Sequence, residues 1–161
     1  MNRSLVRAVG VLAALAALAG ATACSPVDKP VLALRVVNEQ PTLLVAECGV
    51  FTADRISVFT IGVTPTKKWA IIREGGAEAE AVTLLEPPPA WTVEQQTLAT
   101  FEPAVEYAVT AYGDQTDADS VHFTLAQLTE LGPDQVLVSD GGTKRKAVTE
   151  TAFRDKAKKA C

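Results

Sequence analysis

The chain of 161 residues holds few side chains that could do acid–base, nucleophilic or metal chemistry: one histidine, three cysteines and scattered carboxylates. A serine or cysteine hydrolase needs a nucleophile, a base and a group that orients the base. The apolar neighbours Val121 and Phe123 turn His122, the only histidine, towards the outer side of a strand. The sequence contains no HExxH, CxxC or glycine-rich phosphate motif. We therefore expect no catalytic residue, no cofactor and no enzyme activity.

Carboxylates gather in one short segment, "GDQTDADS", which contains Asp114, Asp117 and Asp119. Their oxygens are ligands that calcium accepts, but the segment lacks the EF-hand order. A turn without metal is the alternative, and we expect that. Paired carboxylates can also hydrolyse glycosides. An enzyme or enzyme accessory that acts on a glycan through these acidic residues is therefore the alternative function.

Three prolines precede Trp91 in "EPPPAW". Consecutive prolines favour polyproline II geometry, which could present the indole to a partner. The alternative is that Trp91 packs beneath its own loop, near Trp69 at the sheet edge. We expect the packed arrangement.

The N-terminal segment has the pattern of an export signal. Arg3 and Arg7 precede an apolar run over 8–20, which is followed by the small residues 21–23. The run is shorter than the roughly 20 residues of a membrane span. We expect residues 1–23 to be a signal peptide cleaved after Ala23, with a retained anchor as the alternative.

Ala21-Thr22-Ala23-Cys24 resembles the lipobox of bacterial lipoproteins, although alanine stands where leucine is usual. This resemblance implies that Cys24 carries a diacylglyceryl group, and several acyl chains anchor a protein stably. An ordinary secretory signal is the alternative. Residues 24–30 contain Pro26 and Pro30 and are expected to form an extended tether.

The two remaining cysteines lie on apolar faces. Cys48 ends an alternating segment over 42–48, and Cys161 continues the helical stripe of Phe153 and Ala157. Outside the cytoplasm, two thiols in one domain usually pair. We expect a Cys48–Cys161 disulfide that holds the last helix on a sheet, with two buried free thiols as the alternative.

The charge argues against nucleic acid as a partner. Without Arg3 and Arg7 the chain has 13 basic and 19 acidic residues, a net charge of −6. Basic residues collect at 143–146 and along the expected helix over 149–161. They could face a membrane or a partner, but we favour a merely solvated surface.

Period-two alternation dominates residues 31–148 and predicts many short strands. Turn residues separate them, and Asp140-Gly141 favours a hairpin. This pattern predicts a mainly β chain, an antiparallel β-sandwich with a C-terminal helix over 31–161. The expected strands are 31–37, 42–48, 55–63, 67–72, 80–85, 92–101, 106–112, 120–128, 135–139 and 143–148.

The segment "FEPAVEYAVTAYG" over 101–113 resembles the tyrosine corner of immunoglobulin-like and fibronectin-III-like sandwiches. The resemblance implies that Phe101, Pro103 and Tyr107 fill its places and that the Tyr107 hydroxyl bonds to preceding backbone. Phenylalanine replaces the usual leucine, strand B has no tryptophan, and the last helix is additional. The mature chain also looks like small alanine-rich actinobacterial lipoproteins.

Together these features predict an exported protein anchored by lipid on the extracytoplasmic face of the cell membrane. Its expected role is non-catalytic: binding to, or assembly with, another envelope protein or a polymer. Fold alone does not define such a partner, since sandwich loops carry many kinds of recognition.

Overall fold

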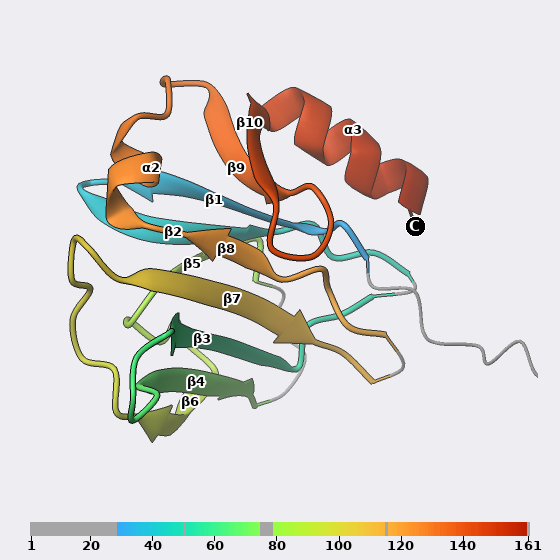
Figure 1. The fold of residues 1–161 in the computed structure, drawn as a ribbon. Helices are drawn as coiled ribbons and strands as arrows, with labels where there is room; N and C mark the ends of the chain where they lie inside the picture. The colour runs from blue at the N-terminus through green and yellow to red at the C-terminus, as the bar shows by residue number, and fades with distance from the viewer. Residues whose placement is uncertain (1–28, 50, 75–78, 115, 161) are drawn as a thin grey trace, which may run out of the picture.

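The computed structural model describes residues 29–49, 51–74, 79–114 and 116–160. Ten strands in this part form two antiparallel five-stranded sheets that pack face to face, and a helix lies outside one of them (Figure 1). The predicted fold class, an antiparallel β-sandwich with a C-terminal helix, is therefore confirmed.

The first sheet has the order β10-β9-β1-β2-β5. Its central hairpin pairs β1 with β2 from Leu32↔Val45 to Val37↔Gln40. The β9–β10 hairpin turns at Gly141 and Gly142, whose φ values of 92° and 58° suit glycine, as the predicted turn requires. The strands span Leu32–Val37 (β1), Gln40–Val45 (β2), Ala81–Thr83 (β5), Gln135–Ser139 (β9) and Arg145–Thr149 (β10).

The second sheet has the order β6-β4-β3-β7-β8. Its central strand β3 pairs with β7 over seven positions, from Arg55↔Tyr112 to Ile61↔Glu106. The strands span Arg55–Ile61 (β3), Lys68–Arg73 (β4), Trp91–Gln96 (β6), Glu106–Tyr112 (β7) and Val121–Phe123 (β8).

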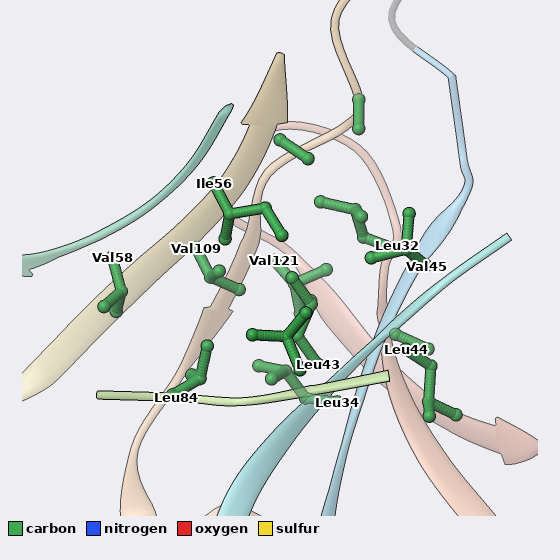
Figure 2. Packing of buried hydrophobic residues seen from close by; sticks show 14 of the residues in the cluster. Leu32, Leu34, Leu43, Leu44, Val45, Ile56, Val58, Leu84, Val109 and Val121 are labelled. Carbon is green, nitrogen blue, oxygen red and sulfur yellow. The ribbon is translucent and has the colours of Figure 1, made fainter. Parts of the chain in front are cut away.

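The core lies between the sheets, where alternate residues of both point inward. Leu34 and Leu43 are register partners on the first sheet, and Ile56 and Val109 come from the second. Figure 2 shows these side chains meeting in one cluster. All four are fully buried, as are Ala33 of β1 and Ala108 of β7 on the other face, so alternation marks the core face of these strands but does not predict the burial of their outer face.

Several predicted strands extend beyond the observed ones: 42–48, 55–63, 80–85 and 92–101 end at Val45, Ile61, Thr83 and Gln96, and the largest difference lies in 120–128. The segment 120–128 is strand only up to Phe123, because Thr124 begins the short helix α2, Leu125–Thr129. The Thr124 hydroxyl accepts from the Gln127 N–H, and the Gln127 side chain accepts from the Thr124 N–H, a capping box that satisfies helix-start donors. Leu128 is consequently the buried residue of this turn.

The last helix, α3, spans Glu150–Ala160 and packs on β9 and β10 with Phe153 and Ala157 buried. Neither helix of the described residues combines the length and the apolar character that membrane crossing requires. α3 runs so that its C-terminal end lies beside the start of β1 (Figure 1).

Candidate functional site

The candidate site is the end of the sandwich at which the described chain begins and α3 stops (Figure 1). We call it the anchor end and define it by Lys29, the described residues of segment 47–54 (47–49 and 51–54) and of loop 113–119 (113–114 and 116–119), and the last two turns of α3. Loop 113–119 and segment 47–54 both contribute residues to a hollow that Lys29 also lines.

Lys29 is fixed from two directions. Its backbone N–H donates to the Asp117 carbonyl at 2.9 Å, and its carbonyl accepts from the Asp119 N–H at 2.8 Å. Its Nζ donates to the Ala160 carbonyl at 2.9 Å. The residue thus joins the acidic loop to the C-terminal end of α3, where a cation complements the helix dipole.

The final turns of α3 carry one buried apolar stripe, and the positions outside that stripe are mostly exposed lysines. Phe153 and Ala157 face the sheet, whereas Lys156, Lys158 and Lys159 are exposed. Lys158 and Lys159 lie in the last turn, where cations suit the exposed carbonyls.

Cys48 lies at the same end and is half-buried. It exchanges backbone hydrogen bonds of 2.8 and 3.0 Å with Phe51, which closes a tight turn. A hollow of about 760 Å³ is lined by Cys48 together with Ala157 and Lys158 of α3. Cys161 and Cys24 lie outside the described residues, so the disulfide and the lipid attachment stay predictions.

A buried ion pair lies beside Cys48 and was missed from the sequence. Arg73 Nη2 donates to Glu47 Oε1, and their side chains are only 5 % and 12 % exposed. The same oxygen accepts from the Ala53 N–H at 2.9 Å, while Glu47 Oε2 and Arg73 Nε have no partner in the described residues. The sequence contains one signal for this pair. Side chains alternate between the two faces of a strand, so Arg73 lies on the same core-facing side of β4 as Trp69.

Trp91 is buried rather than presented to a partner, with 7 % of its surface exposed. The guanidinium of Arg73 lies 5.1 Å from its ring centroid, within cation–π range. Trp91 therefore contributes to the ion-pair cluster, which agrees with the expected packed arrangement.

The opposite end of the sandwich holds the tyrosine-corner residues. The Glu102 N–H donates to the Tyr107 hydroxyl at 2.7 Å, the type of contact that the motif makes. The Phe101 ring lies edge-on to Tyr107 with centroids 4.9 Å apart, and Phe123 lies 5.4 Å from Tyr107. Pro103 is exposed in the turn before β7.

His122 is less exposed than its outward position on β8 predicts, because Glu106 of β7 and Arg145 of β10 lie beside it. Only 13 % of its side chain is exposed, and Nδ1 lies 3.4 Å from Glu106 Oε1. A hydrogen bond from Arg145 lowers the pKa of Glu106, against the opposing effect of burial, and His122 lowers it further. The cluster joins the two sheets, so its charged side chains have a structural role without any catalytic one being needed.

The acidic loop shows no metal-binding arrangement. Asp114 lines the hollow beside Lys29, and the Asp117 carbonyl accepts from the Lys29 backbone. Throughout the part of the chain that the structure describes, no three His, Cys, Asp or Glu side chains are grouped so that they could hold a metal ion.

The fold and this end define a two-layer β-sandwich whose described N-terminus is fastened to its last helix. Comparison with family models, curated proteins and solved structures finds no match to this chain. Functional inference therefore depends on the residues themselves.

Proposed function

We propose that the protein is an exported, lipid-anchored component of the cell envelope that acts as a non-catalytic binding or assembly module. The observation that carries the proposal is the order of residues before the domain: a basic start, an apolar run over 8–20, three small residues and Cys24. Lipid on Cys24 would hold the domain at the extracytoplasmic face of the membrane.

The place of Lys29 supports the anchoring part of the proposal. Lys29 follows Cys24 by only five residues and is fastened to loop 113–119 and to α3. A lipid on Cys24 would therefore be connected to a part of the sandwich that is held by hydrogen bonds, and not to an unattached terminal segment.

A Cys48–Cys161 disulfide belongs to the same proposal. The last described residue, Ala160, precedes Cys161 directly, and Ala157 and Lys158 line the hollow that Cys48 lines. A bridge would close a loop of more than 100 residues and stabilise the fold by about 2–5 kcal/mol. It would hold α3 against the sheet at the end from which the lipid pulls.

The binding part is supported by one edge of the second sheet. Five of the six residues of β6 are exposed, and Ile72 of the adjacent β4 is 36 % exposed. Edge strands with open hydrogen-bonding groups are templates for pairing with another chain. A strand of another protein chain would therefore suit this edge, and the proposed location makes that chain an envelope protein.

The experiment is the intact mass of protein purified from membranes, before and after reduction with thiol alkylation. We expect a chain that starts at residue 24 with a diacylglyceryl group and two thiols that react only after reduction. A Cys24→Ser variant is the matched control and should leave the membrane fraction. An unlipidated wild-type mass with three reactive thiols would contradict both the anchor and the disulfide.

The binding role needs a separate test, in cells. A photo-crosslinking residue at Thr92, exposed on β6, should capture a defined partner, whereas one at Thr151, exposed on α3, should not capture it. Equal capture at both positions, or none at Thr92, would contradict partner binding at this edge.

A further inference from the structure

We propose that the exposed lysines of α3 form the membrane-facing surface of the domain and bind the anionic headgroups of the leaflet that holds the Cys24 lipid. The inference rests on the proposed lipid anchor. It adds to that anchor a surface, a partner and an orientation of the sandwich on the membrane.

The length of chain before the domain limits where the membrane can lie. Lys29 lies five positions after Cys24, and a fully extended chain covers at most about 3.3–3.6 Å per residue. The lipid attachment point is therefore within roughly 18 Å of Lys29. The tether therefore keeps the anchor end near the leaflet, whereas it does not hold the far end of the sandwich, where Tyr107 and the β3–β4 connection lie, against the membrane.

The position of Lys29 selects α3 as the nearest basic element. Its Nζ is 2.9 Å from the carbonyl of Ala160, so the root of the tether touches the end of the helix. Lys156, Lys158 and Lys159 are exposed within the last two turns. With Lys29 they place four ammonium groups near the point at which the lipid enters the bilayer.

The loop that pairs with the Lys29 backbone is acidic, and this gives the domain a direction. Asp114 and Asp117 belong to the loop that pairs with the Lys29 backbone, while Asp119 lies nearer the helix and lines a small hollow with Lys156. An anionic surface attracts the lysines and repels the loop, so we infer that the sandwich tilts towards α3. The chain without residues 1–23 has a net charge of −6, so the domain as a whole is repelled by an anionic membrane. Any attraction must therefore come from the local cluster of lysines.

The test attaches the chain to vesicles without relying on cellular lipidation. A chain that starts at residue 24 keeps every described core residue, since these lie between Val31 and Ala157. Its Cys24 is coupled to a maleimide lipid, and peptide mass verifies the coupled site. Trace acetylation by a water-soluble reagent then measures the reactivity of each lysine.

On phosphatidylcholine vesicles containing phosphatidylglycerol, we expect Lys158 and Lys159 to react at least about threefold more slowly than on phosphatidylcholine alone. Lys67, 45 % exposed in the β3–β4 connection, is the internal control and should react equally on both. Salt at about 1 M, where screening acts within about 3 Å, should remove the difference. Equal reactivity of the α3 lysines on both vesicles would overturn the proposal.

Two charge-matched variants separate this surface from general attraction. Lys156→Gln with Lys159→Gln should abolish the slower reaction of Lys158, whereas Lys67→Gln with Lys68→Gln should leave it unchanged. Equal loss in both variants would overturn the proposal, because net charge would then be the cause. The vesicle experiment does not depend on cellular lipidation, because the lipid is attached chemically. Failure of the proposed anchor would instead appear in the intact mass of the protein purified from cells, as a missing lipid on Cys24.

Discussion

The two ends of the sandwich are held together by different forces. The end at the start of β7 is closed by the rings of Phe101, Tyr107 and Phe123, and the Tyr107 hydroxyl accepts one hydrogen bond from the Glu102 N–H. The anchor end is held by backbone bonds at Lys29 and by the Arg73–Glu47 ion pair. Aromatic contacts depend on shape and tolerate changes of salt and pH. Ion pairs respond to such changes, and they occur at both ends: Arg73–Glu47 at the anchor end and Arg145–Glu106 at the start of β7.

Removal of a ring from the aromatic end should have the largest effect. Phe123 is fully buried against Phe101 and Tyr107, so Phe123→Ala leaves a cavity between the sheets. We expect the free energy of unfolding to fall by about 3–5 kcal/mol. Urea denaturation followed by tryptophan fluorescence measures it, and a loss below about 1 kcal/mol would show that this end is not a packed core.

The buried ion pair gives the corresponding test at the anchor end. Arg73→Met leaves the Glu47 carboxylate buried without its cation and should cost about 2–4 kcal/mol. The double variant Arg73→Met with Glu47→Gln should recover most of that loss, because no uncompensated charge remains. A double-mutant cycle by urea denaturation measures the coupling, and additive losses would contradict an energetically coupled pair.

The Tyr107 hydroxyl should contribute less than either. Tyr107→Phe keeps the ring contacts and removes only the acceptor of the Glu102 N–H. Because Glu102 is exposed, water can replace part of this bond, and we expect a loss of about 0.5–1.5 kcal/mol. The same denaturation assay applies. A loss as large as that of Phe123→Ala would show that the hydrogen bond, not the packing, holds this end.

The smallest effect concerns Glu106, whose pKa lies below its ordinary value of 4.5 mainly through the hydrogen bond from Arg145. A carboxyl group with a lowered folded pKa stabilises the fold above its unfolded pKa and loses that contribution as pH falls below 4.5. Glu106→Gln should therefore flatten the acid limb of the stability curve below that pH. Thermal unfolding in buffers of matched ionic strength measures it. An unchanged acid limb would contradict the hydrogen bond from Arg145 as the cause of the lowered pKa.

Local sequence patterns predicted most of the fold because alternation and turn residues act over a few positions. The existence of β1, β3 and β7 follows from the alternation of apolar side chains, and the Asp140-Gly141 hairpin follows from glycine conformation, whereas the register between strands was not predicted. Helix α2 was not predicted, because the segment that contains it continues the alternating pattern of a strand. The capping residues Thr124 and Gln127 indicate a helix start, and this signal conflicts with the alternation.

The sequence by itself determined which residues face inward and which segment precedes Cys24, since both depend on the order of side chains along the chain. Only the tertiary structure decided that Lys29 touches Ala160, that Arg73 meets Glu47, and that Glu106 and Arg145 cover His122. The partners in these contacts lie 131, 26, and 39 positions apart for Lys29–Ala160, Arg73–Glu47 and Glu106–Arg145. No local pattern relates residues at such separations, because the pairing of strands and the packing of α3 bring them together.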